Sequence, residues 1–217
     1  MSPVAPTSVL PELPLFPLAS VLFPGALLPL RVFEVRYLDM VGRAYKAGTP
    51  FGVVCLTQGA EVRVAGADAE QFAAVGTLAR IDTLASPQPG LLQIECTGTE
   101  RFRVRDSTRQ KNGLWTAVVE MLPGDVGLAV PSDLAHTAVA LRRVIETLQA
   151  RQLAEQRTAM RLPFVPPWQF DDCGWVANRW CELLPVPAEL KQRLMELDSP
   201  LMRLELVSDV LARTGIA

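Results

Sequence analysis

The sequence contains few of the residues from which enzyme and metal sites are usually built. Among its 217 residues there is one histidine, His136, and there are three lysines, Lys46, Lys111 and Lys191. A single histidine excludes every metal site that needs two imidazole ligands. None of the lysines lies in the glycine frame of a phosphate-binding loop, and no GxGxxG motif opens a helix after a strand. We therefore expect no catalytic residue, no bound metal and no cofactor.

Cysteine is also sparse. Four cysteines occur, Cys55, Cys96, Cys173 and Cys181, and no two of them form a CxxC pair. Their spacing matches no zinc motif, and their number is far below the density of a disulfide scaffold. Cys55 and Cys96 lie in apolar, strand-like runs, so we expect both to be buried free thiols.

The chain has no strong excess of charge of either sign. Lys and Arg number 21 and Asp and Glu number 23, which gives a formal net charge of −2 and a pI of about 5.5. Because phosphate binding requires clustered Lys and Arg, we expect no nucleic-acid partner. The hydrophobic fraction of 49% excludes global disorder.

Residues 8–30 form an apolar run that resembles a signal or membrane segment in composition only. No basic residue precedes Arg31, and Glu12 interrupts the run. Five prolines would break a spanning helix: Pro11, Pro14, Pro17, Pro24 and Pro29. We expect a folded segment of a cytoplasmic protein that contacts no membrane.

The hydrophobic periodicity changes once along the chain, near residue 125. Before it, apolar runs and alternation predict strands at 13–18, 25–33, 51–56, 75–85, 91–98, 101–106 and 115–122, and a short strand at 61–64. One helix is predicted to begin at 34 and to end at Gly48. After it, helical spacing predicts a long helix whose N-cap is Ser132, and three more over 173–184, 188–197 and 201–213. Ser199–Pro200 is predicted to cap the last of these helices, with proline at its favoured first position. Such segregation is typical of an α+β fold. We expect a flexible leader over 1–12, a β-rich sub-domain over 13–125 and a helical sub-domain over 126–217.

Several side-chain clusters allow two interpretations. The alternating Arg101, Arg103 and Arg105 are either a cationic face for phosphates or acidic peptides, or a solvated strand face paired with nearby acids. Three tryptophans at 168, 175 and 180 line either a ligand pocket or the packing face of a short helix. The pair Asp171–Asp172 either binds a metal or stabilises the start of the next helix.

Five blocks in order resemble one family. Residues 13–37, LPLFPLASVLFPGALLPLRVFEVRY, are similar to the opening of the substrate-binding N-terminal domain of Lon proteases, and especially to the stand-alone Lon-domain proteins. Later blocks at 51–54, 75–81, 98–104 and 184–194 follow in the family order. Arg31 and Val35 depart from the His and Pro that are usual there. The resemblance implies a PUA-like β pseudo-barrel with one early helix, followed by an α-helical bundle. It also implies a relative of Lon without chemistry of its own, because no ATPase or Ser–Lys protease motif occurs in these residues.

The leading hypothesis is a non-catalytic module that binds unfolded or exposed polypeptide segments, together with a protease or chaperone as partner. An open sheet edge or a cleft between sub-domains would take an extended chain by strand addition. The candidate contact residues are Phe33, Glu34, Arg36 and Tyr37, with Arg101 and Arg103 behind them. The alternative for the first four is structural: Phe33 and Tyr37 in the core, and Glu34 and Arg36 bracing the helix.

Two other functions compete with this hypothesis. RNA binding rests on analogy with other PUA-like folds, and the acidic pI opposes it. A small-molecule site or hydrolase would use His136, Cys173 or the Asp171–Asp172 pair.

Overall fold

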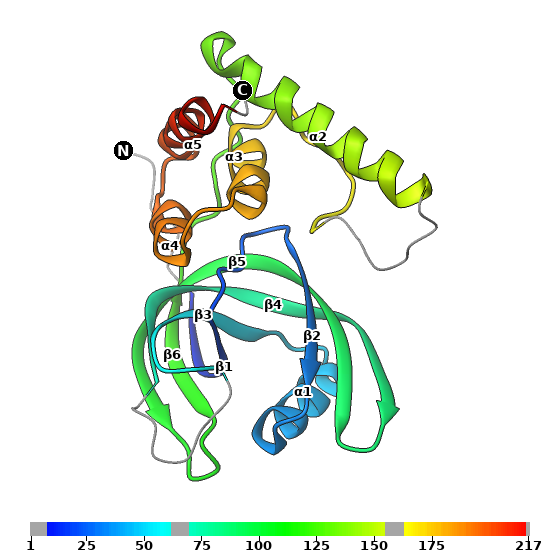
Figure 1. Ribbon diagram of the computed structural model, residues 1–217. Helices are drawn as coiled ribbons and strands as arrows, with labels where there is room; N and C mark the ends of the chain where they lie inside the picture. Colours follow the sequence, from blue (N-terminus) through cyan, green and yellow to red (C-terminus); the bar gives the residue numbers. More distant parts are fainter. Residues whose placement is uncertain (1–7, 62–69, 155–162, 216–217) are drawn as a thin grey trace. The chain divides into compact units, whose positions relative to one another are not determined.

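The computed structural model describes residues 8–61, 70–154 and 163–215 (Figure 1). The chain divides into two compact units, Met1–Gly124 and Asp125–Ala217. The first unit contains all the strands and one helix of the described residues, and the second contains the remaining helices. The fold is therefore α+β, with a mixed sheet, as the change of periodicity near residue 125 predicts.

The strands of the first unit form one sheet, most of which closes into a ring. Its elements are β1 (Val9–Leu18), β2 (Leu27–Val32), α1 (Val35–Ala47), β3 (Phe51–Gln58), β4 (Gln71–Gln88), β5 (Leu91–Arg109) and β6 (Trp115–Met121). The strand order is β2-β5-β4-β3-β1-β6, and β5 also pairs with β6. Five strands thus complete the ring, whereas β2 lies outside it and pairs with no described strand other than β5. Among the strand pairs of the described residues, only β1–β3 is parallel.

The ring encloses a small apolar core that depends on glycine. The core cluster consists of Leu13, Leu15, Val54, Leu78, Phe102, Ala117 and Val119. At Gly76 an added Cβ would lie 2.4 Å from the carbonyl oxygen of Val53 and 2.6 Å from the ring of Phe102. The strands therefore approach one another more closely than any larger residue at this position would allow.

A glycine also explains why the sequence predicted two strands where the structure has one. Residues 91–98 and 101–106 belong to the single strand β5, which continues through Gly98. A Cβ at Gly98 would lie 2.4 Å from the carbonyl oxygen of Phe23. This glycine allows the loop before β2 to approach the strand, and it does not interrupt the strand.

The first strand begins earlier than expected. Residues Val9 and Leu10 pair with β6, opposite Glu120 and Val119. Strand β1 therefore includes residues 9–12, which the sequence assigned to a flexible leader. Residues 1–7, and residues 62–64 of the short strand predicted at 61–64, lie outside the described residues.

Helix α1 begins and ends where the periodicity predicts. Glu34 is its N-cap residue, and Gly48 ends it in the left-handed conformation with φ of 63°, donating its N–H to the last carbonyls. One face is buried, through Arg36, Tyr37, Met40, Val41 and Ala44.

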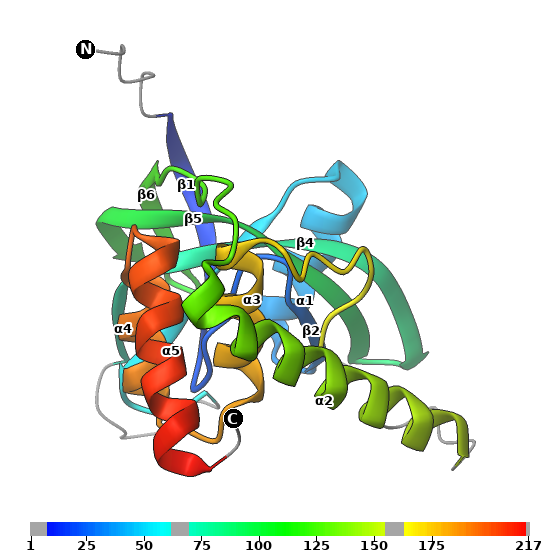
Figure 2. The same cartoon turned by 90° about the horizontal axis from the view of Figure 1, so that it is seen from above.

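The second unit consists of α2 (Ala135–Ala154), α3 (Cys173–Leu183), α4 (Ala188–Glu196) and α5 (Pro200–Thr214), preceded by a 3-10 turn at Ser132–Leu134 (Figure 2). The N-cap predicted at Ser132 is wrong, because Ser132 lies inside the 3-10 turn. The cap predicted at Ser199–Pro200 is confirmed: Ser199 Oγ accepts from the N–H of Met202 at 3.2 Å. None of the described helices is both long enough and apolar enough to span a membrane.

Helix α3 is the centre of this unit. It packs against α2 and α5, and Trp180 is buried and donates its Nε1–H to the Thr137 carbonyl at 3.0 Å. Trp175 packs edge-to-face with Phe164, Trp168 and Phe170. The tryptophans are thus packing residues, one of the two interpretations that the sequence allowed. All four cysteines are buried and free, as expected for Cys55 and Cys96.

Candidate functional site

The site begins at the strand outside the ring. Strand β2 pairs antiparallel with β5, from Leu27 opposite Thr97 to Val32 opposite Leu92. Within the described residues no strand lies along its other edge (Figure 1). Pro29 is in the middle of β2, where its missing N–H is tolerated because the strand is at an edge. The backbone groups on the outer side of β2 are therefore available to an added strand.

Two large apolar side chains are exposed where β2 leads into α1. Phe33 is 54% exposed and Val35 is 74% exposed. Arg31, near the end of β2, is exposed as well. These side chains stand on either side of buried Val32 and of Glu34, so the turn presents apolar and cationic groups beside the open edge.

The buried side chain of Arg36 stabilises this turn through a hydrogen bond and two ion pairs. Its side chain is only 5% exposed, and its Nη1–H donates to the carbonyl of Gly113 at 2.9 Å. Its other nitrogens form ion pairs with Glu34 at 3.0 Å and with Glu70 at 3.2 Å. Burial alone would lower the pKa of Arg36, but Tyr37 and the two carboxylates outweigh it and raise the pKa. The guanidinium therefore stays charged and joins the start of α1 to two distant loops.

Glu70 and Tyr37 complete this network. The second oxygen of Glu70 accepts from Trp115 Nε1 at 2.7 Å, so both carboxylate oxygens are used. Tyr37 stacks on Phe16 with ring centres 4.0 Å apart, and the Arg36 guanidinium lies 4.5 Å from the Tyr37 ring. Burial raises the pKa of Tyr37 well above its usual value, so the phenol remains neutral.

The arginines of β5 do not form a uniform cationic face. Arg101 is buried and donates from Nη2 to the carbonyl of Pro123 at 3.2 Å. Arg103 is half-buried and lies opposite Glu120 in the β5–β6 register. Arg105 is exposed and forms an ion pair with Glu120. Because one of these arginines is buried and another is paired with an acid, the strand does not present the uniform cationic face that phosphate binding would need.

The structure thus gathers four of the six sequence-predicted residues at one turn and leaves two elsewhere. Phe33, Glu34, Arg36 and Tyr37 lie together at the β2–α1 turn, of which only Phe33 is largely exposed. Arg101 and Arg103 lie in β5 beyond the segment that pairs with β2. Both residues are paired with β4 there, and Arg103 is also paired with β6.

Sequence reasoning missed Glu70 and Trp115, which complete the network around Arg36. Arg36 and Glu70 are 34 positions apart, and Arg36 and Gly113 are 77 apart. No local pattern signals such pairs.

Three residues of the competing hydrolase hypothesis, His136, Cys173 and Asp172, have structural partners. His136 has its Nδ1 3.0 Å from the Asp133 carbonyl and its Nε2 3.1 Å from Ser208 Oγ, a pairing that the sequence did not reveal. Ser208 lies inside α5, where the neighbouring backbone amides donate within the helix. We interpret the pair as a hydrogen bond between α2 and α5.

Cys173 and Asp172 also have structural roles, as a buried thiol and as the cap of α3. Burial, helped by Asp172, raises the pKa of the Cys173 thiol to about 11, which leaves it protonated and unreactive. Asp172 caps α3 by accepting from the N–H of Trp175 at 2.7 Å, the helix-start role that the sequence allowed. The described part of the chain contains no group of three or more His, Cys, Asp or Glu arranged to hold a metal.

Comparison with known proteins gives a consistent result. Residues 12–213 match the family described as the ATP-dependent protease La (LON) substrate-binding domain. The chain is 30% identical to the Lon protease of Paraburkholderia phytofirmans over 96% of its length, but it spans only 25% of that relative. A Lon N-terminal domain protein from Xanthomonas campestris has a crystal structure that is 32% identical, with a TM-score of 0.70 over 92% of this chain and 98% of that one.

A second solved structure supports the fold alone. It is the N-terminal domain of the Mycobacterium avium complex Lon protease, with 16% identity and a TM-score of 0.55 over 91% of this chain and 96% of that one. The family match covers nearly the whole chain, and the X. campestris structure agrees with it in both sequence and fold. The chain therefore belongs to the family of Lon substrate-binding domains.

Proposed function

We propose that this chain binds extended polypeptide segments at the outer edge of β2 and catalyses no reaction on them. The observation that carries the proposal is the open edge of β2, followed at once by exposed Phe33 and Val35. Main-chain hydrogen bonds to an edge strand provide affinity without demanding a particular sequence. This is the property that a module recognising many unfolded chains requires.

The apolar side chains add a contribution that can be measured. Phe33 is about half exposed, so covering it contributes about 1 to 2 kcal/mol. Pro29 removes one donor from the edge, and exposed Arg31 adds a positive charge. Both features protect an edge from pairing with a second copy of itself. The positive charge of Arg31 also favours a partner chain that carries acidic residues.

The predicted site residues have different roles in this proposal. Phe33, together with Val35, contacts the bound chain. Glu34, Arg36 and Tyr37 position the turn through the buried network described above. Arg103 adds positive charge farther along β5. Arg101 does not contact the bound chain, because its side chain is buried and donates to the Pro123 carbonyl.

The proposal extends to the architecture of the two units and to the partners of the chain. The closed ring of five strands supports its description as a PUA-like pseudo-barrel, and the packing of α3 against α2 and α5 supports that of a helical bundle. We assign the two as sub-domains with a boundary near residue 125 of the chain, in keeping with the compact units Met1–Gly124 and Asp125–Ala217. The partners are unfolded or exposed polypeptides, together with a protease or chaperone that processes them in the cytoplasm.

The test measures binding of a permanently unfolded polypeptide. A reduced and carboxymethylated protein that cannot refold is labelled with a fluorophore, and its anisotropy is followed during titration with this chain. We expect saturable binding and about a tenfold loss of affinity in Phe33→Ser, because 1.4 kcal/mol corresponds to a factor of ten. Val35→Ser should show a smaller loss.

Val126→Ser is the matched control. Val126 is 75% exposed, close to the 74% of Val35, but lies in the other unit. Equal losses in Val35→Ser and Val126→Ser would show that any exposed valine matters and would overturn the assignment to β2. Absence of binding by the unaltered chain would overturn the function itself.

A further inference from the structure

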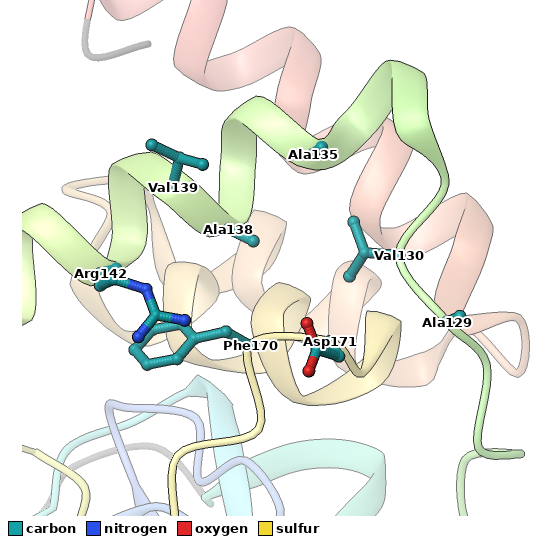
Figure 3. A pocket seen from close by; sticks show the side chains of 8 residues that line it. All are labelled: Ala129, Val130, Ala135, Ala138, Val139, Arg142, Phe170 and Asp171. Carbon is teal, nitrogen blue, oxygen red and sulfur yellow. The ribbon is translucent and has the colours of Figure 1, made fainter.

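The second unit contains a pocket that the site at β2 does not use. Its volume is about 310 Å³, and it lies between the first turns of α2 and two extended segments (Figure 3). The residues that line it are Ala129, Val130, Ala135, Ala138, Val139, Arg142, Phe170 and Asp171. A pocket of this volume is at the small end of ligand sites, which span roughly 300 to 1,000 Å³. It has room for one side chain and the backbone beside it.

One wall of the pocket is a stripe of small apolar residues. Ala135, Ala138 and Val139 have the i, i+3, i+4 spacing that places them on one face of α2. Val139 is half exposed and Phe170 supplies an aromatic surface opposite. Because two of the three helix residues are alanines, the wall leaves space for a branched apolar side chain.

Two opposite charges line the same pocket without pairing to each other. The Arg142 guanidinium lies over the Phe170 ring, 4.0 Å from its centre. Stacking on the ring leaves the N–H groups at the rim of the guanidinium free to donate. Asp171 is exposed and points into the pocket (Figure 3). Over the described parts of the chain, neither side chain forms an ion pair or a side-chain hydrogen bond.

The backbone at the rim also offers hydrogen bonds. Val130 donates to the Asp171 carbonyl at 3.0 Å, and Cys173 donates to the Leu128 carbonyl at 2.8 Å. Ala129 is opposite Asp172 in this antiparallel bridge, so its own N–H and C=O point away from it. These two groups have no backbone partner among the residues that the structure describes. An extended main chain satisfies such groups, whereas a small apolar molecule does not.

We propose that this pocket binds an apolar residue of an extended polypeptide that carries an acidic residue two positions to one side and a basic residue two positions to the other. The spacing follows because side chains two positions apart in an extended chain lie on the same face. The acidic side chain pairs with Arg142, the apolar side chain rests on the alanines of α2, and the basic side chain pairs with Asp171. The inference rests on the proposed function, polypeptide binding, and adds a second contact that prefers a particular charge pattern. It requires no residue of the first unit.

The test uses a short peptide and two variants with the same change of charge. The probe is an eight-residue peptide that contains Glu-Ser-Leu-Ser-Lys, is acetylated and fluorescently labelled at one end, and is amidated at the other. We expect Arg142→Glu to weaken its binding at least tenfold. Arg143→Glu should change it less than twofold, since the neighbouring Arg143 does not line the pocket. Ala138→Phe should also abolish binding, by filling the pocket with no change of charge.

A charge exchange provides the decisive comparison. A peptide containing Lys-Ser-Leu-Ser-Lys should bind Arg142→Glu more tightly than the unaltered chain, because its first lysine then meets a carboxylate. Equal effects of Arg142→Glu and Arg143→Glu, or failure of the exchange, would overturn the pocket assignment. If the pocket variants fail in this way while Phe33→Ser still weakens the unfolded probe, only this inference fails. If the unaltered chain binds neither probe, both proposals fail.

Discussion

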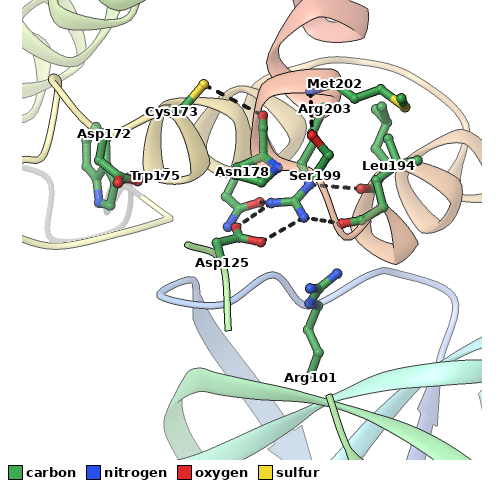
Figure 4. Close-up of polar contacts among 12 residues, drawn as sticks. Arg101, Asp125, Asp172, Cys173, Trp175, Asn178, Leu194, Ser199, Met202 and Arg203 are labelled. Atoms are coloured by element: carbon green, nitrogen blue, oxygen red, sulfur yellow. Dashed lines mark hydrogen bonds and ion pairs between the residues drawn. The ribbon is translucent and has the colours of Figure 1, made fainter. Parts of the chain in front are cut away.

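Replacing Arg203 should destabilise the helical unit more than any exposed substitution in it. Arg203 lies in α5 and is 1% exposed. Its Nη1 and Nη2 form a two-point ion pair with Asp125, at 2.6 and 3.1 Å (Figure 4). Further bonds reach Asn178 Oδ1 at 2.9 Å and the carbonyls of Leu194 and Leu197 at 3.0 and 2.5 Å. All five N–H groups of the guanidinium therefore have acceptors.

Arg203→Met removes every one of these donors while keeping most of the side-chain volume. The carboxylate of Asp125 and the amide oxygen of Asn178 are then left without their charged partner, as are the two carbonyls at the end of α4. Removing one member of a buried pair costs about 3 to 5 kcal/mol. Asp125 retains some exposure, 19%, so water recovers part of the loss for that group. We therefore expect a decrease of about 3 to 4 kcal/mol in the free energy of unfolding of this unit.

Urea unfolding followed by tryptophan fluorescence measures this decrease. Three of the four tryptophans lie in the second unit, and Trp115→Phe removes the signal of the first. Arg213→Met is the matched control, because Arg213 is exposed on the same helix and should change stability by less than about 0.5 kcal/mol. A loss below about 1 kcal/mol in Arg203→Met would refute the reasoning, since it would mean that water replaces the whole network.

Three further predictions concern other positions. Gly76→Ala should destabilise the first unit by about 1 to 3 kcal/mol, because its Cβ would meet the carbonyl of Val53; unchanged thermal unfolding would contradict this close approach. Burial raises the pKa of Glu182 to about 8, against the influence of Arg179, so the folded state holds a proton that the unfolded state releases near pH 4.5. The contribution of Glu182 to stability is therefore complete below pH 4.5 and is lost as the pH rises through about 8, and Glu182→Gln should flatten this dependence in urea titrations across that range. An unchanged slope would show that Glu182 is ionised in the fold. Ser199→Ala should cost about 1 kcal/mol by removing the cap of α5, and Ser199→Asp, measured alongside, should restore most of it.

Sequence periodicity identified most elements because it depends on neighbouring residues. The helix that ends at Gly48 and the capped start of α5 were predicted from spacing, glycine and the Ser199–Pro200 pair. The errors arose where a residue has a different role in three dimensions. The sequence predicted that one strand ends at Gly98 and another begins at 101. In the structure the strand continues, and Gly98 allows the Phe23 carbonyl to lie close to it. Ser132 has the residue type of a cap but lies in a 3-10 turn.

For the candidate site, the sequence located the turn but not the exposure of its residues. The segment 33–37 was selected as a unit, yet within it Phe33 and Val35 are exposed while Arg36 and Tyr37 are buried. Burial of an arginine depends on the carboxylates that surround it. Here they include Glu70, whose placement depends on the whole sheet.

The sequence by itself determined the order of the elements, the change from strands to helices near residue 125, and the family. These follow from local spacing and from short blocks that neighbouring residues define. Tertiary structure alone decided that β2 lies at an open edge, that Arg203 meets Asp125 at a separation of 78 positions, and that Arg142 and Asp171 line one pocket. Such pairings bring together residues that are far apart in the chain. They form only when the packing of many apolar side chains offsets the entropy lost in closing the loops between them.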